Sequence, residues 1–259
     1  MKSKSIQFGS YEFRFRWSLF ITLLILLPLG ITLGFWQMDR AKEKDSIENL
    51  REKNTNQGMI RLGANDNDID TMLYREVSIS GEFKLSQQIL LENKKYKTKP
   101  GYHIFTPMRL QDSDIYILIA RGWVPQGADR RFTPALPGSQ GNQKIQGRVE
   151  RVPSVGLKVG EPGESGMMWP KRLTYLELSW VTKETGYKFL PYVVYQTSGE
   201  DFGLVRDWRQ EFQAKERMSP EKHLGYALQW FSLAALVVIM YLILSIGKSR
   251  RDADSGESS

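Results

Sequence analysis

Two stretches without a charged side chain decide the fold of this sequence: WSLFITLLILLPLGITLGFWQM at residues 17–38 and LGYALQWFSLAALVVIMYLILSIG at residues 224–247. A helix needs about 20 apolar residues to cross the hydrocarbon core of a bilayer, so each stretch is long enough to span it. The second stretch is apolar all round a helix, which disfavours a buried soluble helix. The alternative for the first is a cleavable signal peptide, but its apolar run is too long and no small-residue cleavage site follows. We predict transmembrane helices at 17–38 and 223–247.

Small and aromatic residues fit this assignment. Gly30 and Gly34 form a small-xxx-small pair, which permits close approach of another helix. Aromatic side chains, which favour the headgroup level of a bilayer, occur toward the ends of both stretches. They are Trp17, Phe35, Trp36, Tyr226, Trp230 and Tyr241. The lipid bilayer is therefore an expected partner of the chain.

Basic residues in the short tails predict the topology. Residues 1–16 contain Lys2, Lys4, Arg14 and Arg16. The tail at 248–259 begins with Lys248, Arg250 and Arg251 and then becomes acidic and Ser-rich, which predicts disorder over 252–259. Because cytoplasmic tails carry the excess of Lys and Arg, both termini are predicted to be cytoplasmic and residues 39–222 to be exported.

The sequence of the exported segment predicts one α+β domain with mostly antiparallel β-structure and a curled sheet. Residues 39–57 are rich in helix formers and charges, so the first helix is expected to continue into solvent. The segment predicts five strands, of which the first and the last show alternating apolar residues. These lie at 74–83, 88–92, 102–110, 115–124 and 145–152. The polar residues 111–114 predict an antiparallel hairpin between the third and fourth of these strands.

The end of the domain predicts one helix and one further strand. Apolar residues at helical spacing predict a helix over 173–184, with Gly186 as its C-terminal stop. A last strand is expected at 187–196. This strand contains Pro191, which cannot donate a ladder hydrogen bond, and an edge position is therefore predicted for it.

Composition excludes several classes of function. The 259 residues include no cysteine and only two histidines, so disulfides, thiolate nucleophiles, zinc fingers and iron–sulfur clusters are excluded. The formal charge is +7, but the basic residues form no stripe, and nucleic acid is not an expected partner. The sequence contains no G-x-S-x-G elbow, no P-loop and no H-E-x-x-H motif. We expect a binding or scaffolding module and not an enzyme.

His223 is the first candidate for a ligand. It comes immediately before the second apolar stretch, and on a helix it shares a face with Tyr226, Ala227 and Trp230. A neutral imidazole beside aromatic side chains is suited to ligating a haem iron. The alternative is an interfacial histidine that only caps the helix. The other histidine, His103, enters a predicted strand and is expected to be a structural or a surface histidine.

The exit of the first stretch offers a second group of candidates. Trp36 and Arg40 lie four residues apart and hence on one helical face, with Gln37 beside them. Arg40 is suited to anchoring a propionate or a lipid phosphate; the alternative is an ordinary interfacial cation.

Two further motifs have simpler interpretations. Residues 121–125 read RGWVP and end a strand in a turn, with Trp123 expected in the core and Arg121 as a paired surface charge. The adjacent Met167 and Met168 favour packing over soft-metal binding.

Taken together, these elements resemble the surfeit-locus-one (Surf/Shy) family of assembly factors for haem–copper cytochrome c oxidase. The resemblance covers nearly the whole chain, and its elements occur in the family's order. GFWQMDR at 34–40 is similar to the family's G-x-W-Q-x-x-R, and GYH at 101–103 follows. RGWVP at 121–125 and HLGYALQWF at 223–231 match the family's R-G-W-V-P and H-L-x-Y-A-x-x-W-F. The last two elements and the two-span architecture are specific in combination.

The resemblance implies a role in maturing oxidase subunit I, where haem a is inserted. Some bacterial members bind haem a through the histidine that opens the second span, which here is His223. As a mechanistic hypothesis, His223 is an axial ligand of the haem iron, Trp36 and Trp230 supply apolar walls, and Arg40 neutralises a propionate. Tyr226 is a further cofactor-binding candidate. The exported domain is then expected to dock on the oxidase or on haem a synthase.

One departure from the family is local. Mitochondrial members tend to have an asparagine just before this histidine, whereas residues 219–222 here read SPEK, so the polar partner of the imidazole is unassigned. The chain also has no Arg-rich transit peptide, which favours a bacterial plasma membrane, with the main domain in the periplasm.

Two other functions remain open at this point. The chain can act as a structural chaperone that stabilises subunit I without binding haem. It can also be a membrane-anchored enzyme that acts on lipid or haem, which requires a nucleophile or an acid–base pair that the sequence does not reveal.

Overall fold

The computed structural model describes residues 5–8, 11–127, 133–136, 138–164, 168–207 and 218–248. The chain forms two compact units. Unit 1 comprises residues 1–48 and 217–259, and unit 2 comprises residues 49–216. Several predicted features lie outside the described residues: the basic residues Lys2, Lys4, Arg250 and Arg251, the acidic tail 252–259, and Met167.

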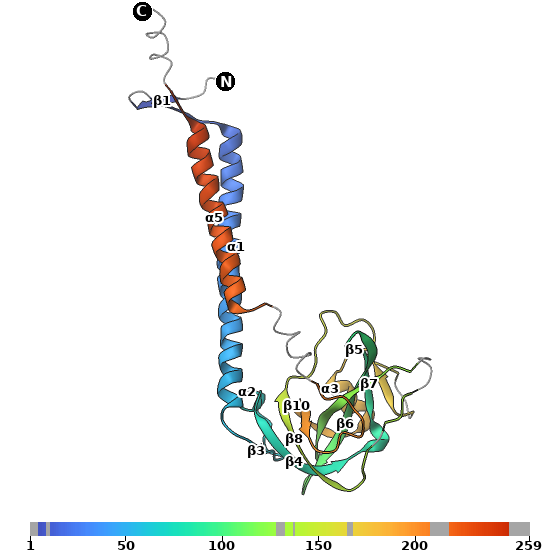
Figure 1. Cartoon of the computed structure of the whole chain (residues 1–259). Coiled ribbons are helices and arrows are strands. Elements are labelled where there is room, and N and C mark those ends of the chain that lie inside the picture. The colour runs from blue at the N-terminus through green and yellow to red at the C-terminus, as the bar shows by residue number, and fades with distance from the viewer. Residues whose placement is uncertain are drawn as a thin grey trace, which may run out of the picture. The chain divides into compact units, whose positions relative to one another are not determined.

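Unit 1 is dominated by two helices that run side by side (Figure 1). α1 covers Trp17–Thr55 and α5 covers Pro220–Ser245. Both are long and apolar enough to cross a membrane, which suggests membrane association. The predicted continuation of the first helix is confirmed, since α1 runs on to Thr55. The second helix starts three residues earlier than predicted, because Pro220 occupies its first turn, where no backbone N–H donor is needed.

A small antiparallel sheet lies at one end of the helix pair and was not predicted. It has the order β1-β2-β11, with β1 at Ser5–Phe8, β2 at Tyr11–Arg14 and β11 at Ile246–Lys248. The Tyr241 ring of α5 lies 6.3 Å from that of Phe13 and 6.2 Å from that of Phe20. The sheet shows that residues 246–247, predicted as helix, are strand instead, and that part of the predicted N-terminal tail is ordered.

Within the described residues, unit 2 is built on one eight-stranded sheet with the order β3-β4-β8-β10-β7-β6-β5-β9. The strands are β3 Ile60–Arg61, β4 Glu76–Phe83, β5 Ile89–Tyr96, β6 Lys99–Leu110, β7 Ile115–Pro125, β8 Asn142–Glu150, β9 Lys171–Leu173 and β10 Lys188–Ser198. The short helices are α2 Ile69–Met72, the 3₁₀ turn η1 Leu85–Gln87 and α3 Leu178–Thr185. Most neighbouring strands are antiparallel, as predicted, but the pairs β3–β4, β5–β9 and β7–β10 are parallel.

The sheet curls until it closes on itself. β4 pairs with β6 as well as with β8, so that β4, β8, β10, β7 and β6 form a closed ring (Figure 1). Closure brings Gly81 of β4 against the backbone of Arg109 in β6, where an added Cβ would collide with the Arg109 carbonyl oxygen. The missing side chain at Gly81 is therefore what allows the two strands to approach.

Both faces of the central strands are buried. Ile117 and Ile119 of β7 belong to a cluster inside the ring, whereas Leu118 and Ala120 belong to a cluster outside it. Trp180 and Val181 of α3 cover this outer cluster. The two-sided burial explains why residues 115–120 read IYILIA as a continuous apolar run and not as an alternating pattern.

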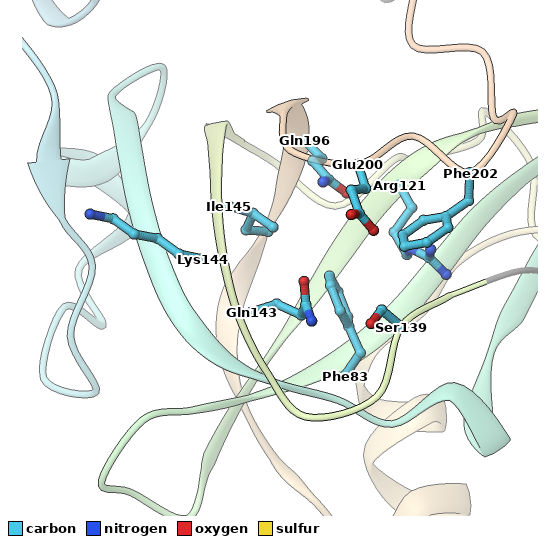
Figure 2. A pocket seen from close by; sticks show the side chains of 9 residues that line it. All are labelled: Phe83, Arg121, Ser139, Gln143, Lys144, Ile145, Gln196, Glu200 and Phe202. Atoms are coloured by element: carbon cyan, nitrogen blue, oxygen red, sulfur yellow. The ribbon is translucent and has the colours of Figure 1, made fainter.

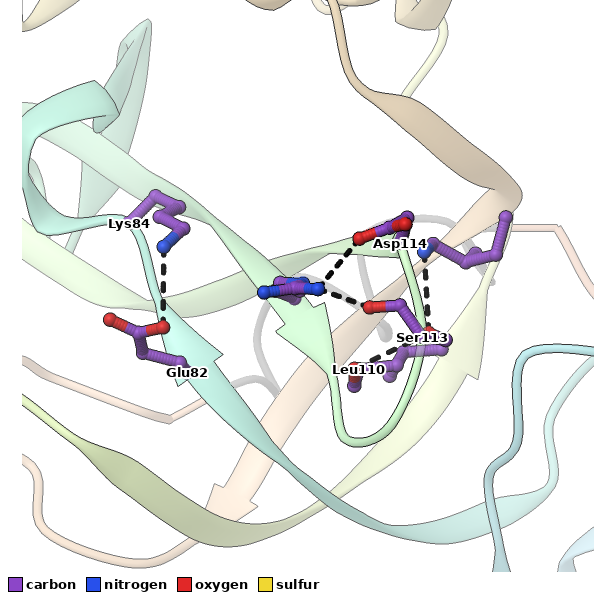
Figure 3. Close-up of polar contacts among 7 residues, drawn as sticks. Glu82, Lys84, Leu110, Ser113 and Asp114 are labelled. Atoms are coloured by element: carbon purple, nitrogen blue, oxygen red, sulfur yellow. Dashed lines mark hydrogen bonds and ion pairs between the residues drawn. The ribbon is translucent and has the colours of Figure 1, made fainter.

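A polar turn joins β6 to β7 and confirms the predicted hairpin. Arg109 donates from Nη2 to Oδ1 of Asp114 at 2.6 Å and from Nε to the Ser113 carbonyl at 2.8 Å (Figure 3). The Ser113 hydroxyl accepts from the Ile115 N–H at 3.2 Å and donates to the Leu110 carbonyl at 3.3 Å. The turn residues thus satisfy backbone groups that would otherwise be left without partners at the end of the hairpin.

Two predictions for the end of the domain were wrong in part. β10 lies between β8 and β7 and is a central strand, not an edge strand. Pro191 is tolerated because it falls in the register shift between Phe189 and Val193, where the ladder with β7 is interrupted.

The predicted helix over 173–184 begins only at Leu178. Leu173 instead ends β9, where it pairs with Leu91 and is fully buried. The predicted stop at Gly186 is confirmed, and this residue adopts the left-handed conformation with φ 73°.

The closure at Gly81 predicts a specific loss of stability. Gly81→Ala places a methyl group against the Arg109 carbonyl and should cost about 1–3 kcal/mol of unfolding free energy. Thermal unfolding of the full chain in detergent, followed by circular dichroism, measures this loss. Gly156→Ala is the matched control, because nothing lies within 4 Å of its Cβ position. Equal midpoints for the two variants would contradict the proposed role of Gly81 in closure.

Candidate functional site

The candidate site lies on the helix pair of unit 1, and glycines set the spacing of that pair. A Cβ at Gly34 would lie 2.5 Å from the Phe231 ring, and a Cβ at Gly30 would lie 3.1 Å from Cβ of Ala234. The contact at Gly34 leaves no room for a side chain and the contact at Gly30 is tight, so the predicted small-xxx-small pair does mark the surface through which α1 meets α5.

His223 and Gln37 are joined across this helix contact. Gln37 follows Gly30 and Gly34 along one face of α1, and His223 lies in the first turn of α5. Nδ1 of His223 is 2.7 Å from Oε1 of Gln37, and only 6% of His223 is exposed. The polar partner of the imidazole therefore comes from the first helix and not from residues 219–222.

This hydrogen bond has a chemical consequence for His223. An amide oxygen only accepts, so Nδ1 carries the proton when it bonds to Gln37 Oε1. The lone pair of a neutral imidazole is then on Nε2, and within the described part of the chain no hydrogen bond engages that atom. Histidines that ligate metals commonly donate their other N–H to an oxygen in this way.

Trp36 and Arg40 lie beside this pair and not against it. Arg40 donates from Nη1 to Oε2 of Glu43 at 2.6 Å, and its guanidinium carbon lies 5.8 Å from the Trp36 ring centroid. About half of the Arg40 and Trp36 side chains is exposed. An exposed ion pair of this type contributes about 0.3–0.5 kcal/mol, so Glu43 holds Arg40 only weakly.

The candidate residues on α5 also differ in whether they take part in the helix contact. Trp230 is partly buried, and its carbonyl oxygen is 3.3 Å from the Cβ position of Gly30. Tyr226 is 43% exposed and therefore does not line the helix contact. The aromatic residue in that contact is Phe231, whose ring lies 5.4 Å from that of Phe35. The spacing of Phe231 from His223, eight residues along one helix, was the available signal for its role.

Two predictions for the strand motif in unit 2 had different outcomes. Trp123 is in the core, 5% exposed, and its Nε1–H donates to the Lys94 carbonyl at 3.1 Å. Arg121 was predicted to be a surface charge, which is wrong, because it is only 1% exposed. His103 is also buried, in β6 opposite Trp123, as expected for a structural histidine.

Comparison with known proteins identifies the family. The model of the SURF1 family matches residues 24–235, which include most of α1, the whole of unit 2 and α5 as far as Ala235. The chain belongs to the SURF1 family.

Relatives of this SURF1 family member include bacterial and eukaryotic proteins. It is 28% identical to a SURF1-like protein of Rickettsia bellii over 91% of this chain and 94% of the relative. A SURF1-like protein of Rickettsia conorii is 29% identical over 86% of this chain and 88% of the relative. Surfeit locus protein 1 of Arabidopsis thaliana is 30% identical over 43% of this chain and 34% of the relative.

These matches confirm the resemblance found in the sequence, and the Rickettsia relatives support a bacterial member. Membership of the SURF1 family suggests a role in cytochrome c oxidase assembly.

The structure brings together the sequence elements that carried the resemblance. GYH at 101–103 and RGWVP at 121–125 lie on β6 and β7, with Gly101 opposite Pro125 and His103 opposite Trp123. The elements at 34–40 and 223–231 meet at the helix contact through Gln37 and His223. The four elements therefore form two groups, one in each unit.

The helix contact predicts a specific cross-link. The double variant Gly30→Cys/Ala234→Cys should form a disulfide on mild oxidation, because the two Cβ positions are 3.1 Å apart and need to separate by only a few tenths of an ångström to reach the about 3.5–4.5 Å of a disulfide. Labelling of free thiols with a maleimide measures it, and the chain has no cysteine of its own to interfere.

The matched control is Gly30→Cys/Gly225→Cys, since nothing lies within 4 Å of the Cβ position at Gly225. The first pair should lose both free thiols and the second should keep them. Equal protection of both pairs would mean that the helices do not meet in this register.

Proposed function

We propose that the chain is an assembly factor for haem–copper cytochrome c oxidase that assists the delivery or insertion of haem a into subunit I. Membership of the SURF1 family supports the oxidase role. The observation that supports the haem role is the contact of His223 Nδ1 with Gln37 Oε1, which leaves Nε2 as the basic nitrogen. On this proposal the chain is a chaperone of the respiratory chain and not an enzyme.

The residues around His223 fit a haem that is carried as cargo. Nε2 of His223 would bind the haem iron, with Gln37 holding the ring orientation. Trp36, Tyr226 and Trp230 offer apolar surface beside it, and the first two are 49% and 43% exposed. Arg40 would exchange the exposed carboxylate of Glu43 for a propionate.

The proposal also places the haem on one side of the helix pair. Phe231 and Ala234 fill the space against Gly34 and Gly30, so the helices leave no room for a planar ligand between them at that level. A haem would therefore lie on the flank of the pair that presents Trp36 and Tyr226, not between the two helices.

The location and partners follow from the same proposal. The two apolar helices would span a bacterial plasma membrane, with both termini in the cytoplasm and unit 2 in the periplasm. Unit 2 would then face the periplasmic side of the partners, which are subunit I of the oxidase and haem a synthase.

One observation favours a second candidate, a structural chaperone that stabilises subunit I without binding haem. A histidine that is 6% exposed and bonded to a facing helix is also what a purely structural interhelical contact requires. The two candidate functions differ at Nε2 of His223. The haem proposal requires this atom as the ligand of the iron, whereas the structural role uses only the hydrogen bond from Nδ1.

A series of variants at His223 separates the two candidates. The full chain is purified with co-expressed haem a synthase, and its reduced-minus-oxidised absorption spectrum is recorded. His223→Ala should abolish the haem a band because the iron loses its ligand, and added imidazole should restore part of it. His223→Gln keeps a side chain that can bond to Gln37 but cannot replace imidazole at iron, so it should also lose the band.

Oxidase assembly in cells provides the second measurement. The haem proposal expects assembly to fail in His223→Gln, whereas the structural candidate expects it to survive. His103→Gln is the control, since it removes the other histidine and should keep the band. A full haem a band in His223→Ala would overturn the assignment of the ligand.

A further inference from the structure

Arg121 occupies an irregular position in β7. Ile104 of β6 pairs with Gly122, and the next residue, Phe105, pairs with Ala120, so Arg121 has no partner in that ladder. Such a bulge bends a strand and re-aims a side chain. Here the guanidinium of Arg121 lies over the Phe83 ring of β4.

Among the residues that the structure describes, the guanidinium of Arg121 is buried without a counter-ion. Arg121 is 1% exposed, and among the described residues no carboxylate lies within ion-pair distance of it. Nη1 donates to Oε1 of Gln88 at 3.1 Å, while the buried Nε has no hydrogen-bond partner in the described part of the chain. Its burial, with a smaller effect of the charge on Arg206, lowers the pKa of Arg121 to about 10, so the group is still cationic at neutral pH.

Two aromatic rings hold this cation in place. The Arg121 guanidinium carbon lies 5.2 Å from the Phe83 ring centroid and 5.6 Å from that of Phe202. Phe202 has a φ of 52°, which is uncommon for a bulky residue. Arg206 fixes this turn by donating to the carbonyl oxygens of Gly199 and Glu200, and its Nε donates to the carbonyl of Arg121 itself at 2.8 Å.

Arg121 lines a small pocket at this position (Figure 2). The cavity has a volume of about 20 Å³, and its wall includes Lys144 and Glu200 as the other charged residues. Ser139 and Gln143 add polar side chains. Glu200 is exposed, so the buried charge in this pocket is the single positive charge of Arg121.

We propose that this pocket binds one carboxylate group through the guanidinium of Arg121. An unpaired buried cation is costly, and the cost is relieved when an anion completes its hydrogen bonds. The planar fork of Nε–H and Nη–H donors matches the two oxygens of a carboxylate. The proposal concerns unit 2 alone and does not depend on haem binding by unit 1.

The size of the cavity limits what can enter. About 20 Å³ exceeds what one water molecule needs, but it is too small for a bulky anion. A short free acid and the Asp or Glu side chain of a protein partner share the required chemistry. Glu200 is the internal competitor, since its own carboxylate borders the pocket.

The test uses the full chain in detergent micelles with ¹⁵N-labelled arginine side chains. The Nε–Hε resonance of Arg121 is identified by its loss in Arg121→Lys. Sodium formate should shift this resonance saturably, whereas formamide, a neutral molecule of the same size, should not. Formate should also raise the thermal unfolding midpoint of the wild type, and this dependence should be lost in Arg121→Met.

Two further samples identify the source of the carboxylate. A tripeptide with a central Glu is compared with its Gln analogue, both with blocked ends. A shift with formate supports a free acid, and a shift with the Glu peptide alone supports a partner side chain. A response to formate only in Glu200→Gln supports the site with Glu200 as its occupant. No shift with either probe in the wild type and in Glu200→Gln overturns the proposal.

Discussion

The close approach of β4 and β6 at Gly81 is the contact on which the arrangement of unit 2 depends. Because these two strands meet, five strands form a ring with an inner core that includes Ile79 and Ile119. The ring also has an outer face, which α3 covers. An open sheet would leave Phe83 and Arg121 on separate parts of the surface. In the closed ring, the guanidinium carbon of Arg121 lies 5.2 Å from the centroid of the Phe83 ring. The position of the pocket is thus a consequence of closure.

Unit 1 depends on a different kind of contact, in which small residues permit a polar one. Gly30 and Gly34 bring α1 close enough to α5 for Gln37 to reach His223. In an apolar setting a polar group that lacks a partner is costly, so the two side chains stabilise each other and fix the register of the helices. The same hydrogen bond selects which imidazole nitrogen remains basic, and structure and chemistry are therefore linked at one contact.

Much of this architecture could be predicted from local sequence. The apolar helices were predictable because length and composition alone decide them, and β4 because Val77 and Ile79 alternate with polar residues. The place of β10 was not predictable, because Pro191 argues for an edge unless a register shift is known to be present. The partner of His223 is 186 residues away, and the burial of Arg121 depends on Phe83 and Phe202 from other segments. Contacts of that kind leave no periodic signal.

The small sheet β1-β2-β11 imposes an order on the making of this protein. β2 pairs with β11, which contains the last described residues of the chain, up to Lys248. The ribosome must therefore synthesise unit 2 and α5 before β2 can pair with β11. For the same reason, α1 cannot pack against α5 until α5 has been synthesised. Unit 2 has all of its strands available earlier and can fold first. Only a chain that has been synthesised as far as β11 can complete this small sheet, so the sheet forms last.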